Sequence, residues 1–301
     1  MILVYLETAA GTPSDLSLQS LTLARSLGDE LTTTTFGPGG DWVIDHQMFS
    51  EYAPEARGEA LAQLTRNLAP AVVMGPGTDT GNEVMAHLAA ILDVALATNV
   101  TEVDVATWEL TRLRWGGSLW ERARLTGSPR LLTVAPHVLP ASDHLVGEVS
   151  RFVPQLDDLL VRTRVVERVE QTGGITLGTA RVIVSGGRGV GSADGFSMLE
   201  ELAARLGGAV GCSRVVTNNG WRPHSDQVGQ TGTRVAPDLY LALGISGAIQ
   251  HWVGMMAAKK ILAINTDPEA PMVTKADYAV IGDLHQVLPA ILAEIEARTR
   301  T

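Results

Sequence analysis

Short apolar runs alternate along the chain with longer segments in which apolar residues recur at helical spacing. A short apolar run bounded by Gly or Pro is typical of a buried strand. The pattern predicts strands over residues 2–6, 31–36, 71–74, 131–134, 180–184, 239–243, 260–264 and 278–281. It predicts helices over residues 16–27, 59–68, 83–92, 196–206, 249–256 and 284–297. Strands that alternate with helices indicate an α/β fold with mostly parallel sheets.

Glycine-rich sequence separates two such patterns and predicts two domains. Residues 161–170 mix apolar and charged side chains in near alternation, which favours an extended connecting strand, and Gly173, Gly174 and Gly178 follow. We expect an N-terminal domain over residues 1–170, with a Rossmann-like parallel α/β sheet. We expect a C-terminal domain over residues 178–301, with a doubly wound parallel sheet; a chain of 301 residues has the length of two domains.

Two further segments of the N-terminal half carry turn signals. The pair Gly116–Gly117 lies between strand-like segments and predicts a β-hairpin. Residues 75–81 form a glycine-containing turn between a strand and a helix, but they lack the GxGxxG spacing and the Lys of a phosphate-binding loop. We therefore interpret residues 75–81 as a structural turn.

Glycine-containing turns follow successive predicted strands in the C-terminal half. They lie at residues 185–189, 211–214, 229–232 and 244–247. The carboxyl ends of parallel strands meet at one edge of the sheet, which is where ligands bind in such folds. Glycine lets the backbone approach a ligand, free N–H groups at a helix start attract phosphate, and Arg188 can neutralise one. This pattern predicts a dinucleotide site.

Charge and composition exclude several classes of function. The formal net charge is −10 at pH 7, which argues against sequence-independent binding to nucleic acid. The single cysteine, Cys212, excludes an internal disulfide; a reactive thiolate beside Arg214 is one interpretation, and a small buried residue at a strand end is the favoured one. The histidines show no metal-ligand spacing. The chain opens on a strand and carries no apolar run of the ~20 residues that span a bilayer, so we expect a soluble cytoplasmic protein.

Several C-terminal segments together resemble one known family. They are Val-Ser-Gly-Gly-Arg-Gly at 184–189, Gly-Cys-Ser-Arg at 211–214, Gln-Val-Gly-Gln-Thr-Gly at 227–232, Gly-Ile-Ser-Gly-Ala-Ile-Gln-His at 244–251 and Ile-Asn-Thr-Asp-Pro-Glu-Ala-Pro at 264–271. This combination resembles the α subunit of electron-transfer flavoprotein. The resemblance is dense from about residue 180 onward and looser, but colinear, before it.

The resemblance implies an electron carrier without a substrate reaction of its own. It implies a heterodimer with a β subunit that often binds AMP, one FAD held mostly by the C-terminal domain, and an N-terminal domain that holds no nucleotide and contacts the β subunit. Electrons would pass from acyl-CoA or related dehydrogenases, as in fatty acid β-oxidation, to a membrane quinone oxidoreductase. No metal is implied.

The resemblance also assigns the residues that contact FAD. They are Arg188, Ser213, Arg214, Gln227, Val228, Gly229, Gln230, Thr231, Ser246, Gly247, Ala248, Ile249, Gln250, His251, Asn265, Asp283 and Leu284. It places Arg188 near the phosphates, residues 213–214 and 228–231 against the flavin, and residues 246–251 from the pyrophosphate to the flavin. Residues 265, 283 and 284 would hold the adenosine end, and Thr266 stands where many relatives carry lysine.

Two of these side chains suggest how the flavin is tuned. His251, at least partly protonated, and the Arg214 guanidinium over the ring would stabilise negative charge on the one-electron-reduced flavin. For Asp283 the residues alone leave two interpretations equal, a helix N-cap and an acceptor for a ribose hydroxyl. The two prolines Pro268 and Pro271 predict an extended loop.

Three alternatives stay open on sequence. A flavin-dependent dehydrogenase acting directly on a small substrate would need a base beside flavin N5, and no acidic residue stands out in the motifs. A regulatory module would bind NAD or FAD as a ligand without redox cycling. A partner subunit with a second flavin would make the complex electron-bifurcating.

Overall fold

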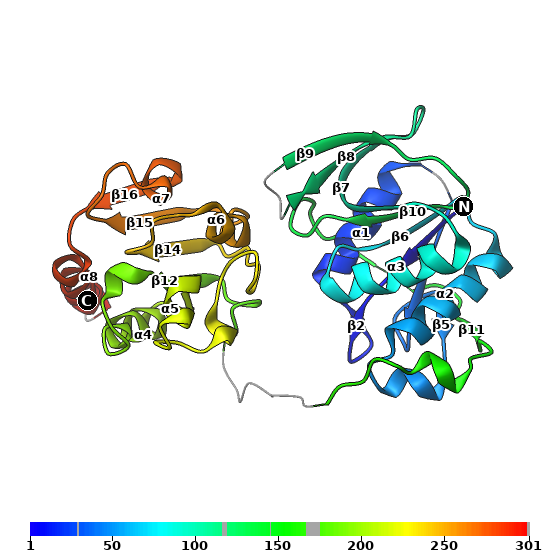
Figure 1. Ribbon diagram of the computed structural model, residues 1–301, viewed down its shortest axis with the longest axis horizontal. Helices are drawn as coiled ribbons and strands as arrows, with labels where there is room; N and C mark the ends of the chain where they lie inside the picture. The colour runs from blue at the N-terminus through cyan, green and yellow to red at the C-terminus, as the bar shows by residue number, and fades with distance from the viewer. Residues whose placement is uncertain (29, 116–118, 145, 167–174, 300–301) are drawn as a thin grey trace. The chain divides into compact units, whose positions relative to one another are not determined.

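The computed structural model describes residues 1–28, 30–115, 119–144, 146–166 and 175–299. The chain separates into two compact units, residues 1–169 and residues 170–301, called unit 1 and unit 2 below (Figure 1). Within the described residues, no helix is both long and apolar enough to cross a membrane.

Unit 1 is built on a nine-stranded sheet in the order β11-β5-β4-β1-β6-β10-β7-β8-β9. The strands are β1 (Ile2–Tyr5), β4 (Leu31–Phe36), β5 (Trp42–Ile44), β6 (Val72–Pro76), β7 (Leu96–Asp104), β8 (Glu109–Arg114), β9 (Leu119–Arg124), β10 (Arg130–Val134) and β11 (Ser150–Phe152). All pairs from β11 to β7 are parallel, and β7, β8 and β9 pair antiparallel. A separate small hairpin joins β2 (Thr8–Ala9) and β3 (Thr12–Pro13).

Helices cover both faces of the unit 1 sheet. They are α1 (Asp15–Ser26), α2 (Pro54–Leu68) and α3 (Asp79–Leu92), with the short 3₁₀ turns η1 (Gln47–Ser50) and η3 (Asp158–Leu160). Side chains alternate along a strand, so Ile2 and Val4 of β1 pack with α1 on one face, and Leu3 and Tyr5 pack with α2 and α3 on the other. Figure 1 shows α2 and α3 packed against each other.

Most unit 1 predictions are confirmed, with corrected boundaries. The predicted helices begin earlier than expected, at Pro54 and Asp79. Pro54 is at the first helical position, where its missing N–H costs nothing, and the Thr78 hydroxyl accepts the Gly81 N–H at 2.8 Å as an N-cap. Strands β8 and β9 form the predicted hairpin, and its Gly116–Gly117 tip lies outside the described residues.

The connecting strand expected over residues 161–170 is wrong where the structure describes it. Residues 161–166 form no strand, and residues 162–166 are exposed to solvent. Among the described residues no strand pairs with residues 161–166, and β-propensity depends on packing against neighbouring strands. Residues 167–170 lie outside the described part, as do Gly173 and Gly174.

Unit 2 is a five-stranded, fully parallel sheet in the order β13-β12-β14-β15-β16. The strands are β12 (Val182–Gly186), β13 (Ala209–Cys212), β14 (Leu239–Leu243), β15 (Ile261–Asn265) and β16 (Tyr278–Ile281). The chain runs outward from β12 to β13 and then returns to β14 on the other side of β12. This reversal is the switch point at which doubly wound sheets bind ligands.

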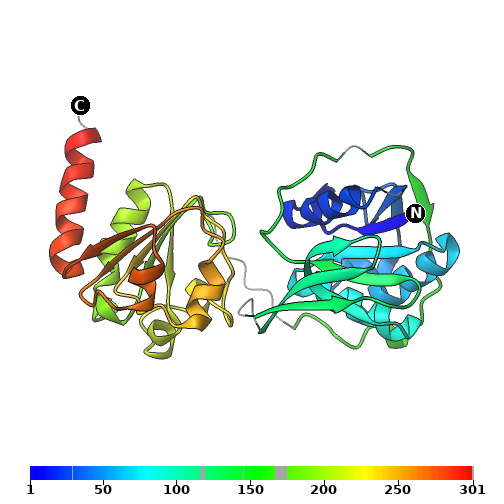
Figure 2. The same ribbon diagram turned by 90° about the horizontal axis from the view of Figure 1, so that it is seen from above.

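Helices lie on both faces of the unit 2 sheet, as the doubly wound prediction requires. They are α4 (Phe196–Arg205), α5 (Arg214–Asn218), α6 (Ile249–Met255), α7 (Pro271–Lys275) and α8 (Leu284–Thr299), with the 3₁₀ turns η4 (Arg188–Val190) and η5 (His224–Asp226). One face packs on α4, α5 and α8, the red helix near the C-terminus in Figure 2. The other face packs on α6 and α7 through Met255 and Met272.

The sequence pattern missed helix α7. The prediction of an extended loop through Pro271 is wrong, because Pro271 occupies the first turn of α7. Proline is well suited to that position. Met272 of α7 is fully buried, and burial of its side chain stabilises a helix that is too short to show a periodic pattern.

Candidate functional site

A cavity of about 680 Å³ lies at the carboxyl edge of the unit 2 sheet. Segments that follow all five strands contribute to its walls. The lining residues are Arg188, Gly189, Ser213, Arg214, Val215, Asn218, Gly244, Ile245, Ser246, Gly247, Ala248, Gln250, His251, Ile264, Asn265, Thr266, Asp267, Ala270, Gly282, Asp283 and Leu284. The volume is typical of a site for a small molecule or cofactor. The predicted turns at residues 185–189, 211–214 and 244–247 lie at this edge after β12, β13 and β14, whereas the predicted turn at residues 229–232 follows no strand of the sheet and does not line the cavity.

Close backbone contact between the segments after β12 and β14 shapes one wall of the cavity. A Cβ atom on Gly187 would lie 2.2 Å from the Gly244 carbonyl oxygen, and one on Gly189 would lie 2.7 Å from the Gly244 Cα. Gly244 itself has a φ of +62°, which favours glycine. These glycines are therefore required for the two segments to lie side by side.

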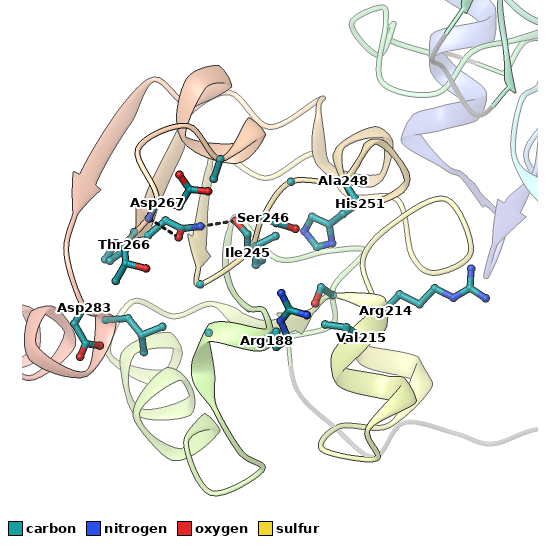
Figure 3. Close-up of a pocket in the computed structure, with 18 of the residues that line it drawn as sticks. Arg188, Arg214, Val215, Ile245, Ser246, Ala248, His251, Thr266, Asp267 and Asp283 are labelled. Atoms are coloured by element: carbon teal, nitrogen blue, oxygen red, sulfur yellow. Dashed lines mark hydrogen bonds between the residues drawn. The ribbon is translucent and has the colours of Figure 1, made fainter.

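Groups that attract an anion face this part of the cavity. The N–H groups of Ser246, Gly247 and Ala248 donate no hydrogen bond within the described part of the chain. Arg188 is exposed, forms no ion pair with a described residue and extends its guanidinium toward these residues (Figure 3). Free backbone donors ahead of helix α6 and a nearby cation make this region suited to a phosphate.

His251 forms a buried part of the wall. Its side chain is 6% exposed, and Nε2 lies 2.9 Å from the hydroxyl of Tyr240 on β14. Nδ1 is buried and makes no hydrogen bond within the described residues. Burial lowers the pKa of His251 to about 4, although the backbone of Val228 acts in the opposite direction. The imidazole is therefore neutral at pH 7.

This neutral ring contradicts the expectation that His251 is at least partly protonated. The expectation considered only the polar turn around the residue. The structure shows that helix α6 turns the ring toward the buried Tyr240, where a charged imidazole would lose its hydration. Nε2 faces Tyr240 and Nδ1 is buried, so neither ring nitrogen is exposed to the cavity.

Ser213 and Arg214 occupy the turn after β13, and their side chains differ in direction. Ser213 is 8% exposed, and its hydroxyl has no hydrogen-bond partner within the described residues. The hydroxyl oxygen is itself buried, so it offers a ligand no exposed contact in this structure. The Arg214 guanidinium extends away from the cavity in Figure 3. Its predicted position over a flavin ring stays a prediction.

Asn265 and Asp283 organise the far end of the cavity. The Asn265 amide donates to the Ile245 carbonyl at 3.0 Å and its oxygen accepts the Asp267 N–H at 3.1 Å. One Asp283 oxygen accepts the His285 N–H at 2.9 Å, as a cap of α8. Asp283 also lines the cavity beside Leu284, so the two interpretations of this residue are compatible.

The segment from Gln227 to Thr231 and the residue Ile249 do not line the cavity. Gln227 and Val228 are buried, and the Gln227 amide bonds the hydroxyls of Thr217 and Thr231 at 2.9 Å each. The Gln230 N–H donates to the Gln250 carbonyl at 2.7 Å. The segment therefore supports the start of α6 from behind, and its predicted cofactor contacts stay predictions.

Other candidate chemistry is absent or inert among the residues that the structure describes. Cys212 is fully buried, and burial raises the pKa of its thiol to about 12, which confirms the structural interpretation. Among the described residues, no group of three His, Cys, Asp or Glu side chains could hold a metal ion. The turn after β6 caps α3 through Thr78, as a structural turn does.

Sequence reasoning left several lining residues out of its predicted site. Thr266 and Asp267 follow β15, and Asn218 lies on α5. Figure 3 shows Thr266 and Asp267 on the wall near Asp283. A signal was available, since Thr266 and Asp267 stand directly after a strand of a parallel sheet.

Comparisons with known proteins agree with this architecture. A family model described as "Electron transfer flavoprotein domain" matches residues 2–157, and one described as "Electron transfer flavoprotein FAD-binding domain" matches residues 176–256. The electron transfer flavoprotein subunit alpha of Mycobacterium tuberculosis is 36% identical over 99% of this chain and 98% of the relative. The subunit of that name from Thermoanaerobacterium thermosaccharolyticum is 36% identical over 87% of this chain and 82% of the relative. Protein FixB of Bradyrhizobium diazoefficiens is 32% identical over 98% and 88%.

Proposed function

Since this chain belongs to the electron transfer flavoprotein α-subunit family, we propose that its unit 2 cavity binds one FAD and that the chain carries electrons between other redox proteins. The observation that carries the proposal is the cavity of about 680 Å³ formed by segments after all five parallel strands of unit 2. A dinucleotide is long enough to pass several strand ends, which is where doubly wound sheets hold such ligands.

The residues of the cavity fit the parts of FAD. Arg188 and the free N–H groups of residues 246–248 suit the pyrophosphate. The close approach of Gly187 to Gly244 leaves backbone, rather than side chains, against the ligand. Asp283, at the opposite end, suits a ribose hydroxyl. Ser213 and His251 line the same cavity, and the contacts of their side chains with the flavin stay predictions.

The role of the protein in this proposal is binding and electrostatics. When bound, the flavin supplies the redox chemistry, including its ability to accept and release single electrons. The chain's residues hold it, orient it and set the polarity around it. The Arg214 guanidinium lies on the solvent side of the cavity, so its contribution to the flavin ring requires a change of side-chain rotamer on binding.

We propose that unit 1 contacts an electron transfer flavoprotein β subunit and that the heterodimer takes electrons from acyl-CoA or related dehydrogenases and delivers them to a quinone oxidoreductase. The family membership supports this proposal, since the relatives are named as subunits of an electron carrier. A cytoplasmic location goes with it. The partner determines whether AMP or a second flavin accompanies the FAD.

A visible absorption spectrum tests the proposal. The chain would be co-expressed with its β-type partner, purified and reduced stepwise. A yellow heterodimer with one FAD, reduced by an acyl-CoA dehydrogenase and its substrate but not by the substrate alone, is the expected result. Reduction by a small substrate without a dehydrogenase would show a direct enzyme, two flavins would show a bifurcating complex, and a colourless complex that refuses FAD would overturn the site.

A further inference from the structure

Donors from other segments of unit 2 hold successive carbonyl groups of the chain after β14. The Ile245 carbonyl accepts a hydrogen bond from the side-chain amide of Asn265, the last residue of β15, at 3.0 Å (Figure 3). The Ser246 carbonyl accepts the N–H of Met272, in the first turn of α7, at 3.1 Å. The end of β15 and the start of α7 therefore fix the peptide groups that precede α6.

The hydrogen bonds of Asn265 also determine which way its amide faces. The amide oxygen accepts the Asp267 N–H at 3.1 Å, and a backbone N–H can only donate. The amide nitrogen therefore faces the Ile245 carbonyl, which can only accept. Both polar atoms of this amide have a partner in the protein, and these two bonds hold the side chain against the backbone of Ile245.

The hydrogen bond to the Ile245 carbonyl determines where the next N–H group points. The peptide bond between Ile245 and Ser246 is trans, so this carbonyl and the Ser246 N–H point in opposite directions. Strand β14 lies between β12 and β15. A carbonyl held toward Asn265 on β15 therefore directs the Ser246 N–H toward the side of β12, whose following segment carries Arg188. Ser246 is exposed in the cavity wall, and its N–H donates no hydrogen bond within the described part of the chain.

We propose that Asn265 is a positioning residue whose amide holds the Ile245 carbonyl and thereby aims the Ser246 N–H at the phosphate-binding part of the cavity. This inference rests on the proposed function for the identity of the ligand, the pyrophosphate of FAD. A donor that is fixed before the ligand arrives stabilises negative charge without reorganisation, and less conformational freedom is lost on binding. The alternative is that Asn265 contributes only by contact with the adenosine end, as the family resemblance implies.

NMR can observe this peptide group alone, because Ile245–Ser246 is the only Ile-Ser pair in the sequence. In the flavin-free full-length chain, labelled with carbonyl-¹³C isoleucine and ¹⁵N serine, an HNCO spectrum contains one cross-peak from this pair. A carbonyl that loses a hydrogen bond shifts upfield, so we expect Asn265→Leu to move the ¹³C resonance upfield. The control Asn219→Leu changes an exposed asparagine that does not line the cavity and should leave the cross-peak in place.

A second variant removes the donor and keeps the rest of the side chain. Asn265→Asp retains the size of the side chain and the acceptor for the Asp267 N–H, but an ionised carboxylate cannot donate to the Ile245 carbonyl. We expect the same upfield displacement in this variant, also if the leucine variant folds poorly. A cross-peak at the wild-type position in Asn265→Asp would overturn the proposal.

Ligand affinity separates the aiming of a phosphate donor from contact with adenosine. Inorganic pyrophosphate and ADP both carry phosphates, and only ADP carries adenosine. Titrated into the flavin-free complex, both should bind about tenfold more weakly in Asn265→Leu than in the wild type, as expected for one impaired hydrogen bond to a charged group. A loss confined to ADP would show that Asn265 acts through adenosine and would overturn the proposal, as would a wild type that binds no pyrophosphate.

The two measurements also distinguish this inference from the proposed function. If the chain binds no FAD, the proposed function fails, and the cross-peak of the flavin-free chain still decides whether Asn265 holds the Ile245 carbonyl. If FAD binds and the cross-peak does not move in the Asn265 variants, the inference alone fails.

Discussion

The two units have the same kind of sheet edge with opposite chemistry. In unit 1, Glu7 stands two positions after the end of β1. In unit 2, Arg188 stands two positions after the end of β12. Glu7 accepts the Thr78 hydroxyl at 2.7 Å, and burial raises the pKa of its carboxyl. Arg188 lines a cavity and forms no ion pair with a described residue. The sheet edge of unit 1 is therefore electrostatically unsuited to a phosphate, and the sheet edge of unit 2 is suited to one.

The two edges also differ in the hydrogen bonding of their polar groups. In unit 1, Thr133 donates to Asn82 at 2.7 Å and accepts the Asn99 N–H at 3.1 Å, while Asn99 Oδ1 has no hydrogen-bond partner within the described residues. In unit 2 the corresponding segments carry glycines, and the N–H groups of residues 246–248 are free. Topology alone therefore does not make a binding site; unpaired donors and empty space are also needed. This contrast supports the expectation that unit 1 holds no nucleotide, which stays a prediction.

The largest expected effect comes from filling the glycine contact. In Gly187→Ala the new Cβ would lie 2.2 Å from the Gly244 carbonyl oxygen, so the backbone must move. We expect a loss of about 3 kcal/mol in the free energy of unfolding and of at least about 100-fold in FAD affinity. Urea unfolding and flavin fluorescence measure the two. The matched control is Gly178→Ala, whose new Cβ would meet no atom within 4 Å. Equal losses in both variants would contradict the requirement for glycine at the contact between residues 187 and 244.

The next largest expected effect is the pH dependence of the free energy of unfolding of unit 2. The pKa of His251 is about 4 in the folded chain and ~6.5 in an unfolded one. The unfolded chain therefore binds a proton that the folded chain does not, and the free energy of unfolding falls as pH drops from about 6.5 to 4. The contribution is on the order of 3 kcal/mol. Hydrogen exchange of the β14 amides would measure it, and His251→Phe should remove this dependence. An unchanged profile would refute the buried neutral state.

Removing the cavity cation should weaken binding without unfolding the chain. We expect Arg188→Ala to lower FAD affinity by about 10- to 100-fold, as for a lost hydrogen bond to a charged group. The loss should shrink at high salt, because exposed charges are screened. Titration of the flavin-free complex would measure both effects. Arg234→Ala, an exposed arginine outside the cavity, is the control, and a comparable loss there would remove Arg188 from the phosphate site.

The smallest expected effect concerns Glu7 in unit 1. Because burial raises its folded-state pKa above 4.5, the folded chain retains a proton that the unfolded chain releases. Stability is therefore lost as pH rises from about 4.5 through the raised pKa, the opposite sign to His251. We expect Glu7→Gln to stabilise unit 1 at pH 7 by about 1 kcal/mol or less, measured by hydrogen exchange of β1. The control Glu51→Gln changes an exposed side chain and should give no such gain in the free energy of unfolding. A lower free energy of unfolding in Glu7→Gln would contradict the raised pKa of Glu7.

The sequence pattern predicted most strands and helices because apolar and β-branched residues form short runs in the strands and recur at helical spacing in the helices. Residues 31–36 and 278–281 have the predicted strand boundaries. Helix α7 was missed because its stability comes from the buried Met272 and not from a periodic pattern. The strand expected over residues 161–166 failed for the converse reason, since local alternation there meets no packing surface.

The predictions about the candidate site also divide into those that the sequence could make and those that needed the structure. The sequence by itself determined which turns lie at the carboxyl edge of unit 2, because glycine spacing, strand order and motif identity are local properties. Together with the family resemblance, it identified Arg188, residues 246–248 and Asn265, which line the cavity. It could not determine that residues 227–231 lie behind α6, because this depends on contacts with Gln250 and Thr217. Only the tertiary structure placed Tyr240 against His251 and so decided that the ring is neutral, since burial and hydrogen-bond partners come from residues distant in sequence.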